Sequence, residues 1–220
     1  MTTLRELDDQ LFTAVNHWAG RTPALHGIFL GYATYGAVLF AALMVAALVL
    51  ARHASTRDLA ATGWVPLAML LALALNQPLG RLVGEARPYD AHPGILRLVD
   101  ATTDFSFPSD HSVMAGAVAA GLLLAHRRLG TVAVAAALLL GFSRVYVAAH
   151  YPWDVAAGLL FGAAVALGGW VVLRRPLIAM TRWLRRRPLF RGVFTEHGTP
   201  PNHPPPGVVP TRVRDMGAGA

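Results

Sequence analysis

The chain has 220 residues, of which 55% are hydrophobic and 14% charged, and its mean hydropathy is +0.46. This balance is too apolar for an ordinary soluble domain and indicates a membrane protein. The absence of cysteine excludes disulfides, thiolate metal sites and cysteine nucleophiles, and all 19 basic residues are arginine, with a formal net charge of +7.

The first 22 residues predict an amphipathic helix. Charged side chains separate apolar ones that recur at helical spacing, namely Leu4, Leu7, Leu11, Val15 and Trp18. This pattern is typical of a helix that lies along the membrane surface, and a helix packed on the remaining bundle fits it as well. Acidic residues stand where a signal peptide would carry basic ones, so we expect no cleaved signal.

Five apolar runs follow, at residues 28–51, 59–79, 112–126, 130–149 and 155–173. A helix needs about 20 residues to cross the roughly 30 Å of hydrocarbon in a bilayer. The sequence therefore predicts an all-α fold, a polytopic membrane helical bundle of about five transmembrane helices within a domain of residues 23–175. The third run is short and rich in Ala and Gly, which predicts that it is buried among its neighbours. The polar segment 80–110 is expected to be a loop.

The tail, residues 176–220, is first rich in arginine and then in proline. It predicts an interfacial helix followed by a disordered segment, and membrane topology explains the arginines better than nucleic-acid binding does. Five spans place 13 of the 19 arginines on the side of this tail, and that side should be the cytoplasm. We therefore expect a multi-pass protein of the plasma (inner) membrane whose loop 80–110 and turn near His150 are extracytoplasmic.

Three polar segments lie at the ends of spans on that outer side. In the segment 143–154, His150 and Asp154 are four residues apart, so on a helix the carboxylate would orient the imidazole, as a nucleophilic or basic histidine requires. Arg144 lies in an apolar run, where a guanidinium is costly unless it meets an anion. A hydrogen-bonded structural histidine is the alternative for His150 alone, and the joint presence of Ser143, Arg144 and Asp154 favours an anion site.

The segment 107–112 predicts the start of a new helix. Ser109 is a good N-cap, and the free backbone N–H groups after it can bind phosphate oxygens. His111 in the first turn could donate a proton to a leaving oxygen. We expect the backbone of Asp110, rather than its carboxylate, to face a phosphate.

The segment 80–88 contains two arginines, Arg81 and Arg87. Their forked guanidiniums suit phosphate oxygens. The alternative is that they only pair with the acidic residues Glu85 and Asp90.

Together these segments resemble the signature of the type 2 phosphatidic acid phosphatase and vanadium haloperoxidase superfamily. The pattern S-R-x5-H-x3-D is matched completely over 143–154, and P-S-G-H is matched except that Asp110 replaces the glycine. The pattern K-x6-R-P is matched at Arg87, but Gly80 replaces the lysine, and Arg81 is the nearest candidate to substitute for it.

The resemblance extends over about residues 25–173 and implies a membrane lipid phosphatase without metal or other cofactor. It implies that His150 is the nucleophile and forms a phosphohistidine, that Asp154 orients it, and that His111 protonates the leaving group and then activates water. It further implies a phosphate-binding set that consists of Arg87, Ser109, the backbone of Asp110, Arg144 and, in place of the lysine, Arg81.

The compact size and the PSDH variant most resemble the bacterial undecaprenyl-diphosphate phosphatases, which implies hydrolysis of undecaprenyl diphosphate to undecaprenyl phosphate. Phosphatidic acid or phosphatidylglycerol phosphate would fit the same site. A membrane homologue with weak or no activity, acting as a transporter or an assembly partner, is the alternative of another class, because the first motif lacks its lysine. The expected partners are a lipid phosphate and the bilayer, with no nucleic acid.

Overall fold

The computed structural model describes residues 2–187, which form helices and no strand, so the predicted all-α fold is confirmed. The predicted proline-rich segment lies outside the described residues. The elements follow one another along the chain in the order α1 (Thr2–Arg21), the short 3₁₀ helix η1 (Pro23–Leu25), α2 (His26–Ala51), α3 (Thr56–Val83), α4 (Pro88–Ala91), α5 (Asp110–Ala125), α6 (Arg127–Tyr146) and α7 (Pro152–Arg186).

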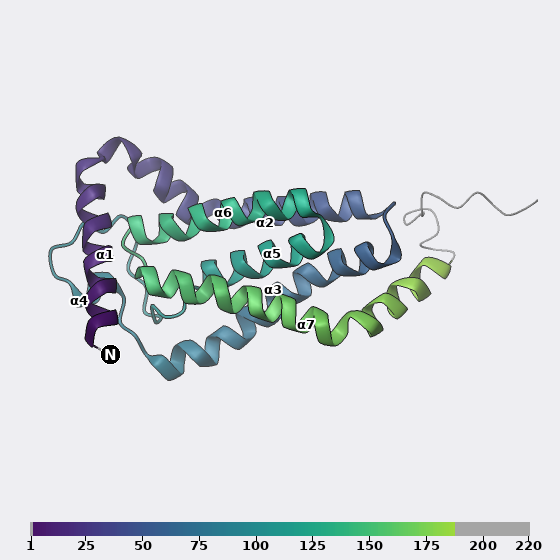
Figure 1. The fold of residues 1–220 in the computed structure, drawn as a ribbon. Coiled ribbons are helices and arrows are strands. Elements are labelled where there is room, and N and C mark those ends of the chain that lie inside the picture. Colours follow the sequence, from purple (N-terminus) through teal and green to yellow (C-terminus); the bar gives the residue numbers. More distant parts are fainter. Residues whose placement is uncertain (1, 188–220) are drawn as a thin grey trace, which may run out of the picture.

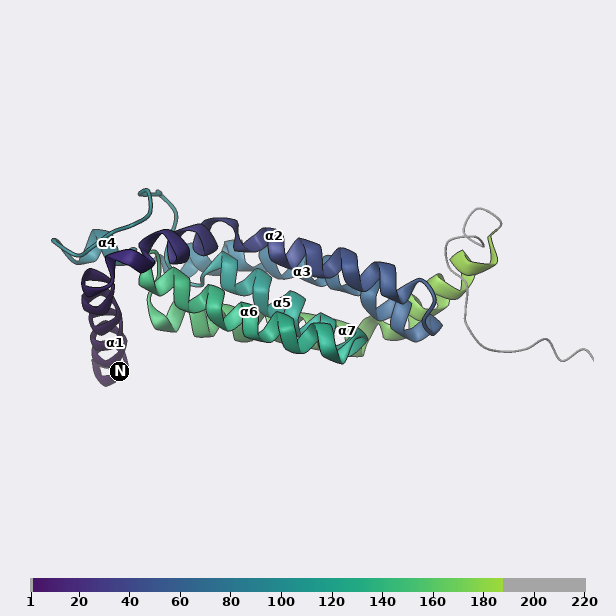
Figure 2. The ribbon, with the colours of Figure 1, turned by 90° about the horizontal axis from the view of Figure 1, so that it is seen from above.

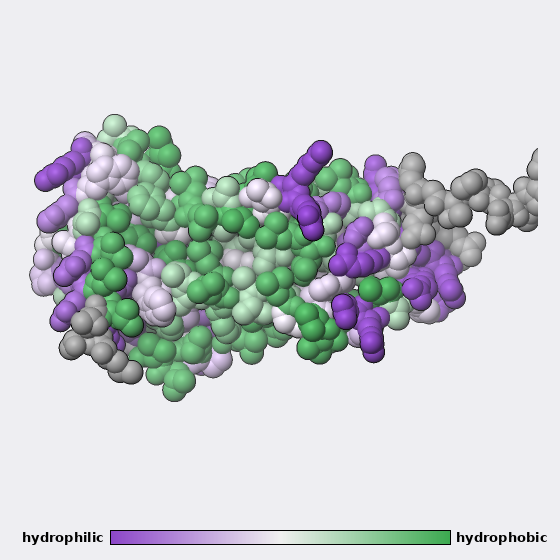
Figure 3. Space-filling model, in the orientation of Figure 1, coloured by the Kyte–Doolittle hydropathy of each residue, from purple (hydrophilic) through white to green (hydrophobic). Residues whose placement is uncertain are grey.

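Four of these helices are long and apolar enough to cross a membrane: α2 together with η1, α3, α6 and α7. The fifth predicted span is α5, whose 16 residues make it the shorter apolar helix of the bundle. At 1.5 Å per residue it is about 24 Å long, less than the hydrocarbon thickness of a bilayer. Figure 3 shows apolar side chains over the middle of the molecule and polar ones toward both ends, as a membrane-spanning bundle requires.

The short helix α5 lies in the centre of the bundle, with α2, α3, α6 and α7 packed around it (Figures 1 and 2). Glycines permit its closest approach to α7. A Cβ atom added at Gly116 would lie 2.2 Å from the backbone oxygen of Leu159, and one added at Gly162 would lie 2.0 Å from that of Val113. Small residues at these contacts let the two backbones meet, which is why the Ala- and Gly-rich run occupies the core.

The amphipathic helix α1 lies across one end of the bundle (Figures 1 and 2). Phe12 is fully buried and contacts the ring of Tyr151, whereas Leu4 on the other side of the helix is 71% exposed. The side chain of Asn16 exchanges two hydrogen bonds with the backbone of Leu96, at 2.7 and 3.1 Å. The helix thus packs on the bundle, holds the loop before α5, and still presents an apolar side.

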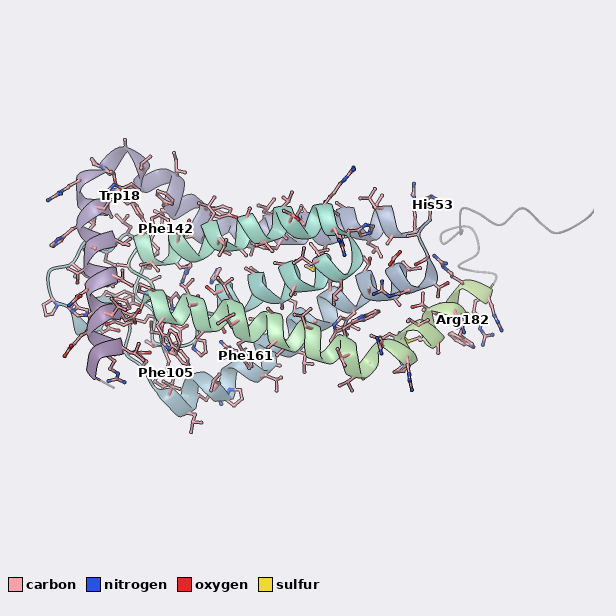
Figure 4. All side chains as sticks on the ribbon, in the orientation of Figure 1. Trp18, His53, Phe105, Phe142, Phe161 and Arg182 are labelled. Atoms are coloured by element: carbon pink, nitrogen blue, oxygen red, sulfur yellow. The ribbon has the colours of Figure 1, made fainter. Side chains whose placement is uncertain are left out.

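Helix α7 continues through the boundary at which the sequence predicts a separate interfacial helix. It runs unbroken to Arg186 although Pro176 lies inside it. Arg185 donates a hydrogen bond of 2.7 Å to the backbone oxygen of Ala54, which ties this end of α7 to the connection between α2 and α3. Figure 4 places His53 and Arg182 at this end of the bundle and Trp18 and Phe105 at the opposite end.

Candidate active site

The three polar segments meet at the α1 end of the bundle, around a cavity of about 320 Å³. The cavity lies where α5 begins, and one residue of α2, Thr34, completes its wall. It is lined by five of the eight site residues singled out in the sequence: Arg87, Asp110, His111, Arg144 and His150. Ser109 and Asp154 are buried and do not line it, and Arg81 lines a neighbouring cavity.

His150 lies in the turn before α7 rather than on the helix, because Pro152 begins that helix. Its side chain is buried, and Nδ1 lies 2.8 Å from the backbone oxygen of Ser106. A carbonyl oxygen only accepts, so Nδ1 carries a proton. Nη1 of Arg87 only donates and lies 3.3 Å from Nε2, so Nε2 accepts through its lone pair, beside the cavity that both residues line.

Asp154 lies behind His150, and its carboxylate is 3.6 Å from Nδ1. The same carboxylate oxygen accepts hydrogen bonds from the Ser106 hydroxyl and, at 2.8 Å, from the backbone N–H of Tyr151. Ser106 therefore contacts both members of the pair, through its carbonyl and through its hydroxyl. Nothing in the sequence marks Ser106, since it stands two residues before the matched motif, which begins at Pro108.

The position of His150 favours its neutral form. Burial lowers the pKa of its imidazole well below the usual value, and the positive charges of Arg144 and Arg87 lower it further. A neutral imidazole, whose Nε2 keeps its lone pair, is the form that can attack phosphorus.

Arg87 is 6% exposed, and its guanidinium forms a forked ion pair with the carboxylate of Asp104. The two contacts measure 2.8 Å from Nη2 and 3.2 Å from Nε, and Nη1 donates at 2.8 Å to the backbone oxygen of Ala149. The ion-pair partner of Arg87 is therefore Asp104, and not Glu85 or Asp90, the acidic residues near it in sequence. Burial raises the pKa of Asp104, but hydrogen bonds from Thr102 and Arg87 outweigh it and leave the pKa below its usual range.

Arg144 reaches from α6 toward α2, where its Nη1 donates at 3.3 Å to the backbone oxygen of Ala33. Its Nε is buried and has no hydrogen-bond partner among the described residues. A buried guanidinium N–H without a partner is costly, and a phosphoryl oxygen in the adjoining cavity would satisfy it.

Ser109 precedes α5, but its hydroxyl does not cap the helix, contrary to the expectation from its position. Contact with α7 holds its backbone instead. Its N–H donates to the backbone oxygen of Asp154 at 3.2 Å, and its own oxygen lies 2.9 Å from where a Cβ of Gly158 would stand. The first N–H groups of α5 have no partner within the helix and lie at the cavity where His111 also stands.

The carboxylate of Asp110 is held by two amides of α3. The Asn76 amide donates to it at 2.7 Å, and the Gln77 amide donates to both oxygens at 3.2 and 3.3 Å. Asn76 is buried, and it ends a run of apolar residues in α3, where a polar amide is the signal by which the sequence could have revealed it.

Arg81 lines a second cavity, of about 260 Å³. It is exposed, and it makes no hydrogen bond or ion pair with any residue that the structure describes. At Gly80, where the motif has lysine, an added Cβ would lie 3.2 Å from the backbone oxygen of Phe107. Within residues 2–187 no group of three or more His, Asp or Glu side chains is placed to hold a metal ion.

Comparison with known proteins places this geometry in a family. Two curated bacterial proteins are similar in sequence. The undecaprenyl-diphosphatase BcrC of Bacillus subtilis is 30% identical over 159 residues, which cover 72% of this chain and 79% of that protein. The bacitracin transport permease protein BcrC of Bacillus licheniformis is 34% identical over 101 residues, 46% of this chain, and the matched region spans half the length of that protein.

Among solved structures, that of Aquifex aeolicus LpxE superposes with a TM-score of 0.60 at 26% identity, covering 75% of this chain and 95% of that one. The model of the PAP2 superfamily matches residues 61–177, which include all three segments of the site. The chain therefore belongs to the PAP2 superfamily.

Proposed function

We propose that this chain is a membrane lipid phosphatase that hydrolyses undecaprenyl diphosphate to undecaprenyl phosphate. One observation carries the proposal: Nδ1 of His150 lies 2.8 Å from the backbone oxygen of Ser106, and the residue lines a cavity that two guanidiniums also line. Burial lowers the pKa of its imidazole, which favours the neutral form. The substrate is the one for which the B. subtilis relative, an undecaprenyl-diphosphatase, is named. Membership of the PAP2 superfamily supports the wider class, phosphoric ester hydrolysis.

In the first step Nε2 of His150 attacks the terminal phosphorus, and the bond between that phosphorus and the bridging oxygen breaks. His111 lines the same cavity and donates a proton to the departing oxygen. Arg87, Arg144 and the N–H groups at the start of α5 hold the three remaining phosphoryl oxygens, where negative charge accumulates. Arg87 can do so while it stays paired with Asp104, because its five N–H groups include some that are not donated to Asp104 or Ala149.

In the second step His111 takes a proton from water, the resulting hydroxide attacks the phosphohistidine, and the N–P bond breaks to release orthophosphate. The lone pair returns to Nε2. Ser106 and Asp154 touch no substrate atom in this scheme; they keep the proton on Nδ1 through both steps. They are positioning residues.

We further propose that the site faces the extracytoplasmic side and that the end of the bundle at which α2 joins α3 and α5 joins α6 faces the cytoplasm. Arginines flank the helices at that second end, among them Arg52, Arg57, Arg127, Arg128, Arg174 and Arg175. The positive-inside rule assigns such an end to the cytoplasm.

The test of the activity is phosphate release by the purified protein from undecaprenyl diphosphate and from phosphatidic acid, side by side. We expect release that disappears in the His150→Ala variant, with faster turnover of the diphosphate. Release that persists in His150→Ala would contradict the nucleophile. No release by the wild type from either lipid would favour a homologue without activity.

A further inference from the structure

The cavity that Arg81 lines lies directly beside the one that holds His150. Four residues line both cavities: Asp104, Phe105, Pro108 and Asp110. Gln77 and Thr103 supply further polar groups to the second cavity. It is therefore a polar space adjoining the phosphoryl site, at the end of α3.

The first cavity offers no guanidinium beyond the two that would hold the transferred phosphate. These belong to Arg87 and Arg144, and the carboxylates of Asp100, Asp104 and Asp110 also line the cavity. A phosphomonoester brings up to two negative charges, and a diphosphate brings a further one on its second phosphate. A cation outside the first cavity would favour the binding of that second phosphate.

Arg81 meets this need because its guanidinium is free of any partner among the described residues. The carboxylates that share its cavity are already engaged, Asp104 by Arg87 and Asp110 by the amides of Asn76 and Gln77. An anion at Arg81 would thus meet a full positive charge and two carboxylates whose charge is partly compensated.

We propose that the second cavity binds the phosphate that remains on the lipid, and that Arg81 thereby selects diphosphates over monophosphates. The inference rests on the proposed phosphatase function. One oxygen joins the two phosphates of a diphosphate, so two adjoining cavities suit them. When the bond from the terminal phosphorus to the bridging oxygen breaks, that oxygen leaves with the lipid phosphate. The proton from His111 neutralises part of the negative charge on the leaving phosphate, and the remaining charge lies beside Arg81.

Arg81 stands one residue after position 80, where the motif has lysine, and this shift fits the binding of the second phosphate. Positions 80 and 81 both line the second cavity and neither lines the first, and a Cβ at position 80 would lie 3.2 Å from the backbone oxygen of Phe107. A cation at position 81 therefore adjoins the neighbouring phosphate without that close contact.

The experiment compares Arg81→Ala with Arg97→Ala. Arg97 is the matched control because it is also an arginine of the loop side, with its guanidinium 5.4 Å above the ring of Tyr89, a wall residue of the first cavity. For Arg81→Ala we expect kcat/KM on undecaprenyl diphosphate to fall about 10- to 100-fold, as for a lost charged hydrogen bond, while phosphatidic acid turnover changes less than about threefold. Arg97→Ala should leave the ratio of the two substrates unchanged.

A binding measurement tests the inference without turnover. Methylenediphosphonate and methylphosphonate are non-hydrolysable probes with two and one phosphorus groups. Calorimetry on the detergent-purified protein should show that Arg81→Ala weakens methylenediphosphonate about tenfold or more and changes methylphosphonate by less than about twofold.

Equal losses for both probes and both lipids, no loss for any of them, or loss of selectivity in Arg97→Ala alone would each overturn the assignment of Arg81. Failure of the phosphatase function is recognised separately, by a wild type that releases no phosphate. The affinities of the wild type and of Arg81→Ala for methylenediphosphonate would then still decide whether Arg81 binds a second phosphate.

Discussion

At the scale of single residues, the orientation of His150 depends on a backbone carbonyl more than on a carboxylate. The Ser106 oxygen is 2.8 Å from Nδ1, whereas the Asp154 carboxylate is 3.6 Å away. The Asp154 carboxylate accepts a hydrogen bond from the Ser106 hydroxyl and another from the backbone N–H of Tyr151 at the start of α7. It therefore acts on His150 through Ser106 and through the start of this helix. The short link from Asp154 to Ser106 to His150 therefore places the imidazole that we propose as the nucleophile.

Replacement of Ser106 tests this link. Ser106→Ala removes the hydroxyl and keeps the carbonyl, so we expect kcat to fall about tenfold, the cost of one buried hydrogen bond of about 1.4 kcal/mol, with KM unchanged. Ser112→Ala is the control, because Ser112 is also buried near α7 and its hydroxyl has no partner among the described residues. A fall in kcat of the same size in both variants would point to packing rather than positioning.

The protonation of His150 gives a second prediction at this scale. Burial and two neighbouring guanidiniums lower its pKa below the usual value of about 6.5. The folded protein therefore keeps this imidazole neutral as the pH falls through 6.5, and protonates it only at lower pH. NMR titration of ¹⁵N-labelled imidazoles, with His150→Ala to assign the signal, should show the Nε2 lone pair retained at pH 6. A midpoint at or above 6.5 would contradict the electrostatic environment described for the site.

At the scale of elements, the contact between α3 and α5 fixes the position of the Asp110 carboxylate. Asp110 stands in the first turn of α5, beside the phosphoryl cavity, and the amides of Asn76 and Gln77 on α3 hold its side chain. Without them the carboxylate could turn toward the phosphate and repel it. We therefore expect the motif with Asp110 in place of glycine to depend on these two amides, which lie one turn before the first motif begins.

A double-mutant cycle tests this dependence. Asn76→Ala should raise KM for the lipid diphosphate about five- to tenfold with a smaller effect on kcat, and Asp110→Gly in the same chain should restore most of the loss, a coupling of about 1 kcal/mol. If Asn76→Ala costs the same with glycine at position 110, Asn76 acts by another route, such as its 3.1 Å hydrogen bond to the backbone oxygen of Pro108.

At the scale of the whole molecule, the parts of the fold predicted from sequence are those set by local composition. The five apolar runs became α2, α3, α5, α6 and α7, because helices in lipid must satisfy their own backbone hydrogen bonds. The meeting of the three segments also followed, since each lies at a span end. The pairing of Arg87 with Asp104 and of His150 with Ser106 could not be predicted, because it depends on the path of the irregular loop 92–109.

The orientation of the molecule in the membrane can be measured directly because the chain has no native cysteine. Asp90→Cys places a thiol on exposed α4 at the site end, and Arg128→Cys places one at the exposed start of α6 at the other end. In intact bacterial cells a membrane-impermeant maleimide should label position 90 and reach position 128 only after permeabilisation, because the positive-inside rule predicts a cytoplasmic location for the arginine-rich end. Loss of one arginine of 19 leaves that bias in place. The reverse labelling pattern would put the phosphoryl site in the cytoplasm, and a lipid diphosphate would then have to be presented from the inner leaflet.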